Sequence, residues 1–473
     1  MKQQFSIKLR LCFFLLSLTI ISCSEDAGIA IDKSLLEEKV EEATSILTAS
    51  QEGDAVGQFQ SGSKDELSAA IDEAQLVLQD EEAIQTIVNS AYQSLDTAID
   101  QFRRKGNFEV LTNWEFIRDL TGDELYDLVQ SDEPDIFSII DGATLKDVKI
   151  YKIEYQTNHV DGTSVVASGA ILYADHDASH PLASFQHGTI FTQDDAPSKF
   201  NTERLSAVFG AVLAGSGYAV AMPDYLGFGS SSQVPHPYEH GKTLGSASFD
   251  MLRAAKEFYA VHQQTLSSKL FITGYSEGGY ATMALHQHIE AHSDWQVTMS
   301  APAAGAYNKS AFFKEMMSMT ADYDFPGSPM WVVDAYDWIY DFNKDWDEYL
   351  NEPYATTMKG ISNPFDFISA DLAKSPEKLY TESYRSSIAE GTDATYLAAI
   401  AANDFFDWSP KAPITLYYGT KDSWVFPLNS TSAYEAIMAN GGEIEIVAYQ
   451  GEDHFTSSNI YVRDVFELFE SLR

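Results

Sequence analysis

The sequence has almost no cysteine. Among its 473 residues only Cys12 and Cys23 carry a thiol, and both lie close to the N-terminus. Residues 1–22 begin with the basic stretch MKQQFSIKLR and continue with the apolar stretch LCFFLLSLTIIS, which is too short to span a membrane and has the pattern of a secretion signal. Removal of this segment leaves one cysteine, which excludes an internal disulfide framework and a site built from several thiolates.

Basic residues are also scarce. The chain has 30 lysines and arginines against 70 aspartates and glutamates, a formal net charge of -40. Nucleic acids are bound through basic surfaces that contact phosphates, so we expect no nucleic-acid partner. We interpret the acidity as a source of solubility and of repulsion between copies.

The apolar stretch ends in IISC at 20–23, which resembles the lipobox of bacterial lipoproteins. The resemblance implies that 1–22 is a lipoprotein signal peptide and that Cys23 carries lipid, which leaves no free thiol and excludes a cysteine nucleophile. The following SED at 24–26 resembles the acidic tag that sends some lipoproteins of Gram-negative bacteria to the outer surface. We therefore expect an outer-membrane lipoprotein, surface-exposed or periplasmic and anchored by its lipid. A plain signal peptide is the alternative.

Residues 23–105 are predicted to form three helices. Apolar residues recur at helical spacing in three segments separated by turn-forming stretches, the pattern of a small antiparallel bundle. The stripes are Leu35, Leu36, Val40, Ala43 and Leu47; Leu67, Ala70, Ile71, Ala74 and Leu78; and Ile84, Val88, Ala91, Tyr92, Leu95, Ala98, Ile99 and Phe102. The segment ELSAAIDEAQLVLQDEEAIQTIVNSAYQSLDTAI resembles FIVAR-type helical modules, which accompany domains of carbohydrate-active surface proteins as binders or spacers. We favour a spacer, because the aromatic rings lie at core spacing.

Strand and helix patterns alternate over residues 106–473. VKIYKIEYQT and SVVASGAILYA read as strands separated by the turn NHVDGT, so they are expected to pair antiparallel. Further strand segments then alternate with helical segments to the end of the chain. This alternation predicts an α/β domain whose mostly parallel sheet is covered by helices on both faces.

The interval at about 301–410 interrupts this alternation. It is richer in aromatic residues than the whole chain, which has 13%. A stretch this long is not expected to be a bare loop in a compact domain. We predict a helical cap inserted over the strand ends, whose rings either line a cleft or form the core of the cap. They include Trp331, Trp338, Trp346, Phe405 and Phe406.

Residues 274–278 read GYSEG, a G-x-S-x-G motif between a predicted strand and a predicted helix. This setting is that of the nucleophile elbow, in which serine takes a strained backbone at a sharp turn. Residues without a β-carbon two positions before and after the serine let the strand and the helix approach each other. We predict that Ser276 is a nucleophile.

A serine hydroxyl needs a base, usually histidine, which is itself oriented by a carboxylate. In nucleophile-elbow enzymes the chain order is serine, acid, histidine. His454 follows the last predicted strand, and Asp422 follows the one before it. Both would reach the same sheet edge as Ser276, so we predict this set as the catalytic residues.

Other titratable residues were weighed for these roles. Asp453 is next to His454, and adjacent loop side chains seldom make the required hydrogen bond; Asp404 and Asp407 remain alternatives for the acid. The histidines of the helix after the elbow are interpreted as surface residues: His286, His288 and His292.

Acyl transfer also needs hydrogen-bond donors for the developing oxyanion. The segment SFQHGT ends a predicted strand, and the amide of Thr189 is one candidate donor. The amide of Glu277, directly after the serine at the start of a helix, is the other. The neighbouring side chains of Tyr275 and His187 are predicted to contact substrate.

Residues 145–473 resemble the α/β-hydrolase superfamily. MPDYLGFGSSSQVPHPYEHGKTLGSASFDMLRAAKEF and ITGYSEGGYATMAL are similar to bacterial relatives of the secretory lipase family, with its P-D-Y-x-G-x-G-x-S and H-P-Y segments. In the next family segment, S-x-x-D-x-x-R-A, Asp250 departs from the spacing by one residue, and we interpret this region as structural. The resemblance implies an α/β-hydrolase fold with a helical cap, preceded by the three-helix bundle. It also implies an esterase whose triad maps onto Ser276, Asp422 and His454.

These observations predict a serine carboxylic-ester hydrolase that needs no cofactor and no metal. Its expected substrates are small-molecule, glycan or lipid esters outside the cell. A prolyl-oligopeptidase-like peptidase shares the fold and triad, but no repeat of propeller period precedes the hydrolase segment. A surface binding protein without catalysis is the third hypothesis.

Overall fold

The computed structural model describes residues 31–132, 140, 144–175 and 178–473, so the predicted signal peptide and Cys23 lie outside the described residues. The chain divides into two compact units. One comprises the residues up to Ser50 together with Gly62–Phe102, and the other comprises Gln51–Ser61 together with Arg103–Arg473. Within the described ranges, no helix combines the length and the apolar character that a membrane crossing demands.

The first unit consists of the three predicted helices, α1 (Ser34–Ala49), α2 (Ser63–Gln79) and α3 (Gln85–Arg103). Each helix buries one apolar stripe, which α1 supplies from Leu36, Val40, Ala43 and Ile46. Leu35, predicted in the same stripe, is 65% exposed. The Lys33 ammonium donates to the carbonyls of Leu78 and Asp80 at 3.0 and 2.8 Å, which satisfies orphan acceptors at the end of α2.

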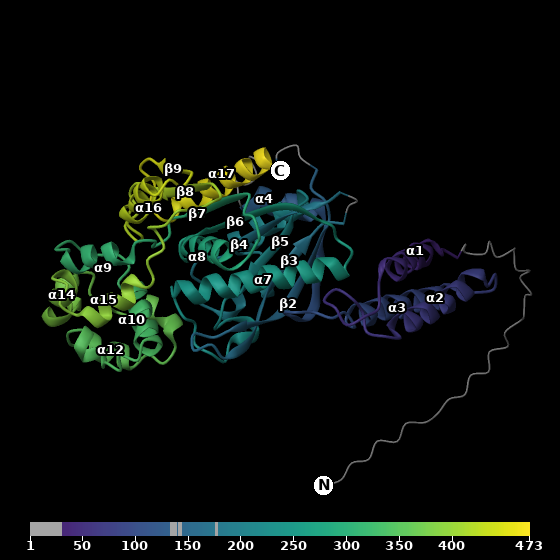
Figure 1. The fold of residues 1–473 in the computed structure, drawn as a ribbon, viewed down its shortest axis with the longest axis horizontal. Coiled ribbons are helices and arrows are strands. Elements are labelled where there is room, and N and C mark those ends of the chain that lie inside the picture. Colours follow the sequence, from purple (N-terminus) through teal and green to yellow (C-terminus); the bar gives the residue numbers. More distant parts are fainter. Residues whose placement is uncertain (1–30, 133–139, 141–143, 176–177) are drawn as a thin grey trace, which may run out of the picture. The chain divides into compact units, whose positions relative to one another are not determined.

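The second unit is built on one nine-stranded sheet (Figure 1). Its strands are β1 (Leu111–Leu120), β2 (Val148–Asn158), β3 (Ser164–Tyr173), β4 (His180–Gln186), β5 (Ala219–Pro223), β6 (Leu266–Tyr275), β7 (Met299–Ala303), β8 (Ile414–Gly419) and β9 (Ile444–Tyr449). They lie in the order β1-β2-β3-β5-β4-β6-β7-β8-β9. From β5 to β9 all neighbours pair parallel, whereas β1, β2 and β3 form an antiparallel edge. The predicted α/β fold is confirmed.

Helices cover both faces of this sheet (Figure 1). The helices outside the cap are α4 (Gly122–Asp132), α6 (Leu205–Gly215), α7 (Gly241–Val261), α8 (Glu277–His292), α16 (Leu428–Ala439) and α17 (Thr456–Leu472). Apolar side chains of α4, α6 and α17 share one core with the sheet, and those of α7, α8 and α16 contribute to another. Successive residues of a strand point to opposite faces of the sheet, so one strand contributes to both cores. In β8, Leu416 packs into the core shared with α7, α8 and α16, and Tyr417 packs into the core shared with α4, α6 and α17.

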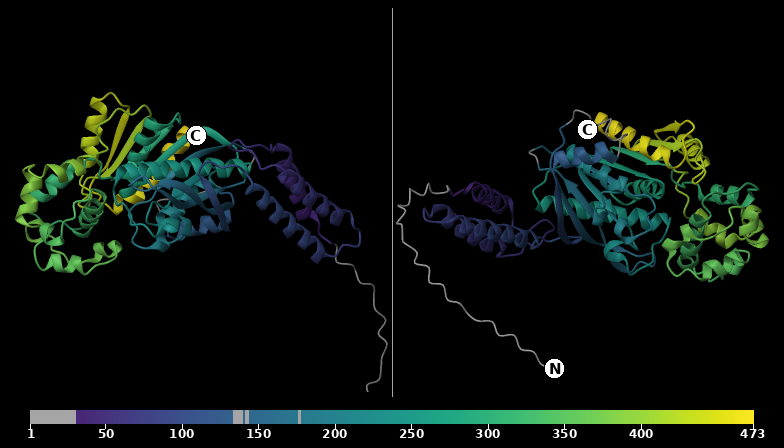
Figure 2. Two further views of the ribbon diagram at one scale, coloured as in Figure 1. Left: turned by 60° about the horizontal axis from the view of Figure 1, so that its bottom comes forward. Right: turned by 180° about the vertical axis from the view of Figure 1, so that it is seen from behind.

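The predicted cap lies between β7 and β8. It consists of α9 (Lys309–Ser318), α10 (Gly327–Ile339), α11 (Trp346–Tyr349), α12 (Tyr354–Lys359), η4 (Pro364–Ser369), α13 (Pro376–Leu379), α14 (Glu382–Ala389) and α15 (Ala394–Ala401). These helices gather at one end of the sheet, beyond the strand ends that carry the connections into them (Figure 2). Their aromatic rings are mostly core: Trp331, Tyr336 and Tyr396 are 3% exposed or less.

Two features differ from the sequence predictions. No strand was predicted over 111–120, yet β1 pairs along β2, and its exposed outer residues left little apolar signal. His286, interpreted as a surface residue, is fully buried, so that prediction was wrong. Its Nε2 lies 3.1 Å from Glu290 on the next turn of α8, and its ring meets Trp408 edge-on.

Candidate active site

Ser276 occupies the sharp turn between β6 and α8. Its backbone has φ 60° and ψ -123°, a left-handed conformation that non-glycine residues rarely adopt and that stores strain. The turn is fixed on both sides, since the Ser276 amide donates to Ala303 in β7 at 2.9 Å and the Tyr280 amide donates to the Ser276 carbonyl at 3.0 Å. The hydroxyl is therefore held where the sheet ends.

The two glycines of GYSEG are required by close backbone contacts. A β-carbon at Gly274 would lie 2.4 Å from the carbonyl oxygen of Gly278. One at Gly278 would lie 2.0 Å from the carbonyl oxygen of Gln186, the last residue of β4. Both distances are far inside van der Waals contact, so the turn and the neighbouring strand fit together only with glycine here.

The structure brings Ser276, His454 and Asp422 together. His454 Nε2 lies 3.0 Å from the Ser276 hydroxyl oxygen, and His454 Nδ1 lies 2.6 Å from Asp422 Oδ2. A carboxylate only accepts, so Nδ1 carries the proton and Nε2 is free to accept from the serine. The residues follow β6, β8 and β9, three parallel strands whose carboxyl ends share one edge of the sheet.

The carboxylate of Asp422 is fixed in this orientation. Its Oδ1 accepts the amides of Trp424 and Val425 at 2.9 and 2.8 Å, which leaves Oδ2 to face His454. Asp422 is 4% exposed and His454 is 6% exposed. Hydrogen bonds of this kind are strengthened when water is excluded.

The alternative acids have other partners. Asp453 accepts the amides of Phe455 and Thr456, both at 2.9 Å, at the start of α17, and these bonds lower its pKa. Asp404 binds the amide and the hydroxyl of Ser310, and Asp407 binds Asn440. Of the acids considered, the structure pairs Asp422 with His454.

The two candidate oxyanion donors lie on either side of the serine. Glu277 is the first residue of α8, and the first amides of a helix have no partner within the helix. The loop with Thr189 passes close by, because a β-carbon at Gly188 would lie 3.1 Å from the Tyr275 carbonyl oxygen. The backbone of Glu277 and the loop before Thr189 thus lie beside the turn that carries Ser276.

Side chains of the H-P-Y segment hold both candidate donors, which the sequence analysis missed. His236 Nε2 lies 2.8 Å from Glu277 Oε1, and the Tyr238 hydroxyl lies 2.9 Å from Thr189 Oγ1. His236 and Glu277 are 5% and 2% exposed. The H-P-Y resemblance was the available signal, but no role was assigned to its side chains.

The side chains of Tyr275 and His187 do not line the space beside Ser276. The Tyr275 hydroxyl donates to the His454 carbonyl at 2.6 Å and lies 2.7 Å from the hydroxyl of Ser457. His187 is buried with its ring nitrogens 2.7 and 3.2 Å from two backbone carbonyls, and burial lowers its pKa. Both residues support the loops that carry the site, and their contact with substrate stays a prediction.

A narrow, mostly apolar cavity opens at Ser276. Its volume is about 20 Å³, roughly the space of one water molecule. Its other walls are Tyr238, Glu239, Ala306, Phe312, Phe313, Met316, Tyr323, Ser328, Pro329, Val332, Trp424 and Val425. At its rim Phe325 stacks on Trp424 at 4.2 Å between ring centroids, and Phe455 is 57% exposed. The cap therefore supplies many of the aromatic and apolar walls of this cavity.

Comparison with protein-family models assigns this arrangement to a family. The model described as "Secretory lipase" matches residues 198–462, which include Ser276, Asp422 and His454 and more than half of the chain. The chain belongs to the secretory lipase family. It is thus an esterase- or lipase-like hydrolase, and the family implies small-molecule ester substrates.

Solved structures share the fold of this secretory lipase. They include the rice cell wall degrading esterase LipA from Xanthomonas oryzae, with 22% identity, TM-score 0.67, and coverage of 77% of this chain and 99% of that one. A proposed hydrolase from Legionella pneumophila has 24% identity, TM-score 0.69, and coverage of 77% and 98%. Candida antarctica lipase A in its closed state has 16% identity, TM-score 0.54, and coverage of 74% and 78%. No curated protein matches the chain.

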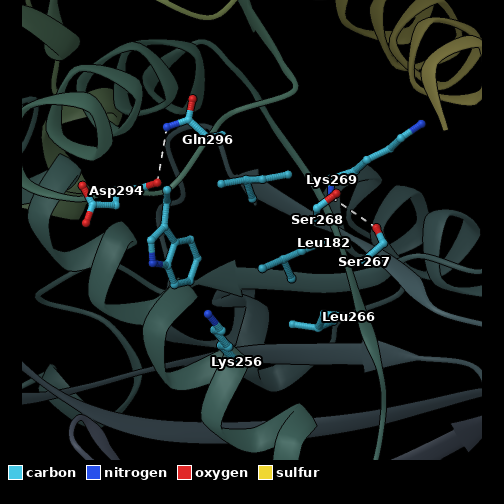
Figure 3. A pocket seen from close by; sticks show the side chains of 10 residues that line it. Leu182, Lys256, Leu266, Ser267, Ser268, Lys269, Asp294 and Gln296 are labelled. Carbon is cyan, nitrogen blue, oxygen red and sulfur yellow. Dashed lines mark hydrogen bonds between the residues drawn. The ribbon is translucent and has the colours of Figure 1, made fainter.

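A second hollow of the secretory lipase lies at the start of β6, away from Ser276 (Figure 3). Figure 3 shows Gln296 donating to the Asp294 carbonyl of its own loop, and Ser267 accepting from the Lys269 amide within β6. The polar side chains that line this second hollow form no hydrogen-bonded set like Ser276, His454 and Asp422. In the described part of the chain, no cluster of three or more His, Cys, Asp or Glu is arranged to hold a metal ion.

Proposed function

We propose that the chain is a serine carboxylic-ester hydrolase that works through an acyl-enzyme. Ser276 attacks the acyl carbon while His454 Nε2 takes the hydroxyl proton, and His454 then gives this proton to the leaving alcohol. Asp422 holds the imidazole and stabilises its charged form. Water then attacks the acyl-enzyme by the same route, with His454 as the base, and Ser276 is regenerated.

The amides of Thr189 and Glu277 are proposed to stabilise the oxyanion. One such donor contributes roughly 3 kcal/mol to lowering the barrier in serine hydrolases. His236 and Tyr238 would act through them by fixing the two loops. They are positioning residues.

One observation carries this function: the continuous path of 3.0 and 2.6 Å from the Ser276 hydroxyl through His454 to Asp422. The test is labelling by a fluorophosphonate probe together with turnover of p-nitrophenyl esters by the wild type and Ser276→Ala. Labelling and turnover are expected in the wild type and are lost in the variant. Ser318→Ala, a serine of α9 whose hydroxyl bonds only to its own helix in the described chain, is the matched control.

The same assay separates the alternatives. Aminoacyl p-nitroanilides cleaved faster than esters would indicate a peptidase instead. Absence of probe labelling in a folded wild-type protein would indicate a binding protein and would overturn the proposal.

We also propose that lipid on Cys23 anchors the protein to the outer membrane and that the FIVAR-like bundle is a spacer. The support is the IISC sequence and the absence of an exposed aromatic platform among the stripe residues of the bundle. The secretory lipase family is consistent with export from the cytoplasm. Incorporation of labelled palmitate is expected in the wild type and not in Cys23→Ala, which should leave the membrane fraction.

The proposed substrates are extracellular glycan or lipid esters. The aromatic and apolar walls of the cavity at Ser276 support an acyl group with an apolar part, which the cap residues must move to admit. Hydrolysis rates on acetyl, butyryl, octanoyl and feruloyl esters would rank the acyl groups, with Ser276→Ala as the background.

A further inference from the structure

Glu239 is a charged residue in the wall of an otherwise largely apolar cavity. It lines the cavity together with Ser276, although it is only 8% exposed. Its backbone φ is 52°, a left-handed value uncommon for a residue with a β-carbon. Residues held in such conformations concentrate at active sites and ligand contacts, because the surrounding structure must enforce them.

The carboxylate of Glu239 has a buried partner. Its Oε2 accepts a hydrogen bond from the Lys309 ammonium, which has no exposed surface and lies 3.9 Å from the centroid of the Tyr280 ring. Burial raises the pKa of Glu239, and the charge of Lys309 counteracts this. Because apolar residues often stabilise a protein as well as a buried ion pair does, stability alone does not account for the pair.

The second oxygen of Glu239 is available to a ligand. Within the described chain, Oε1 has no hydrogen-bond partner, and an ionised carboxylate can only accept. Lys309 already neutralises the charge, so a cationic ligand would gain little and an anionic one would find no donor. A neutral hydroxyl group is the ligand chemistry that fits.

The remaining walls favour an aromatic ring beside that hydroxyl. Phe312, Phe313, Tyr323 and Trp424 all line the cavity, and rings pack well against rings at their edges and faces. The other hydroxyls are engaged: Ser328 accepts from Trp424 Nε1 at 2.8 Å, and Tyr238 lies 2.9 Å from Thr189 Oγ1. Glu239 is therefore the charged acceptor among the described residues of the wall.

We propose that this cavity, widened by movement of the cap side chains that line it, binds the acyl part of the substrate, and that Glu239 selects aromatic acyl groups bearing a hydroxyl, of the hydroxycinnamoyl type. The proposal rests on the function proposed for Ser276. The acyl part is assigned here because it stays on Ser276 after the alcohol has left, so an enclosed cavity suits it better. Glu239 is a specificity residue in this scheme.

The first test uses the wild-type protein and matched esters. Ethyl p-coumarate carries the hydroxyl on its ring and ethyl cinnamate lacks it. A hydrogen bond to a charged group predicts a kcat/KM about 10-fold to 100-fold higher for the coumarate. Equal values for the two esters would overturn the proposal. A preference for 2-hydroxyethyl cinnamate over ethyl cinnamate, without one for the coumarate, would place the hydroxyl on the alcohol and also overturn it.

The second test assigns the preference to Glu239. The double variant Glu239→Leu, Lys309→Met removes both charges, so that no unpaired charge stays buried. Its ratio of kcat/KM for the two esters should fall to within about 3-fold of unity, and this ratio is insensitive to the fraction of folded protein. Asp393→Asn, which alters another lysine–carboxylate pair of the cap, should keep the wild-type ratio. A double variant that keeps the wild-type ratio would overturn the assignment.

The two proposals fail in different ways. Retained p-nitrophenyl acetate hydrolysis in Ser276→Ala would defeat the proposed nucleophile. If Ser276→Ala loses that hydrolysis but the wild type hydrolyses the coumarate and the cinnamate at equal rates, only the role of Glu239 is defeated.

Discussion

His236 Nε2 lies 2.8 Å from Glu277 Oε1, while His236 Nδ1 lies 2.6 Å from the carbonyl oxygen of Leu226. The carbonyl can only accept, so Nδ1 must donate. The contact at Nε2 then needs a second proton, on the imidazole or on the carboxyl group. The residue after the proposed nucleophile is thus held by a buried pair that shares a proton.

Breaking this pair should reduce both stability and activity. Glu277→Ala leaves His236 without its partner, which predicts a loss of about 3 kcal/mol in the free energy of unfolding. It also loosens the start of α8, so kcat should fall at least about 10-fold, because the oxyanion donor is no longer fixed. Urea unfolding and ester hydrolysis measure the two effects.

Glu290→Ala is the matched control, because it breaks the His286 pair of the same helix away from Ser276. It should reduce stability and leave kcat within about 2-fold of the wild type. An unchanged kcat in Glu277→Ala would contradict the positioning role.

Asp422→Asn should lower kcat by roughly 10³-fold to 10⁴-fold with KM nearly unchanged. Asparagine can still accept the amides of Trp424 and Val425, but it no longer stabilises a charged His454. Asp453→Asn, in the residue next to His454, should change kcat less than about 3-fold. The reverse ranking of the two variants in steady-state kinetics would assign the acid to Asp453.

Tyr275→Phe tests the support of the histidine loop. Its hydroxyl donates to the His454 carbonyl and contacts Ser457, so its removal lets the imidazole drift from Ser276. We expect kcat to fall about 10-fold, since small misplacements of a catalytic group are costly, while KM stays within about 2-fold. A larger change in KM than in kcat would restore a direct contact between Tyr275 and substrate.

Gly278→Ala should prevent stable folding or lower the free energy of unfolding by more than about 4 kcal/mol, because its methyl group would overlap the Gln186 carbonyl. Gly360→Ala is the control, since that glycine has φ -80° and its nearest neighbour is 3.3 Å from the added carbon. Thermal unfolding of the two variants should differ clearly. A fully stable Gly278→Ala would contradict the packing described for the elbow.

Acid should destabilise the protein partly through His240. Burial lowers the pKa of His240 to about 4, with help from the charge of Lys242. A histidine in the unfolded chain has a pKa of about 6.5. Between about pH 4 and pH 6.5 this histidine is therefore protonated in the unfolded chain but neutral in the folded chain. The stability that the neutral, buried His240 contributes is fully present above about pH 6.5, declines as the pH falls, and is lost near pH 4.

The expected size of this effect is about 2 kcal/mol between pH 7 and pH 4.5. Between pH 7 and pH 4.5 the free energy of unfolding, measured in urea, should fall by about 2 kcal/mol less in His240→Gln than in the wild type. The exposed His292→Gln is the control. An identical pH dependence in wild type and His240→Gln would refute the assignment.

The arrangement at Ser276 was predictable because each residue follows a strand with a clear apolar pattern. Parallel strands bring their carboxyl ends to one edge, so the positions of Asp422 and His454 followed from the order of elements. The order of elements did not predict that His236 and Glu239 lie near Ser276. They lie in a coil between β5 and α7, where local sequence pattern does not determine which side chains are buried.

The sequence pattern also predicted only part of the burial of side chains in the helices. His286 was assigned to the surface because its spacing from His288 and His292 does not gather the three imidazoles on one face. It is nevertheless buried against Trp408, which is more than a hundred positions away in the chain. Strand β1 escaped prediction for a related reason. Its outer residues are exposed, and only its pairing with β2 reveals it.

Trp424 joins the loop of Asp422 to the cap: its Nε1 donates to Ser328 in α10, and its carbonyl accepts from Tyr323. Admission of a bulky ester requires these cap residues to yield. Each such displacement pulls on the segment whose amides hold the carboxylate. Movement of the cap residues should therefore disturb the hydrogen bonds that hold Asp422, so the orientation of the proposed catalytic acid depends on the position of the cap.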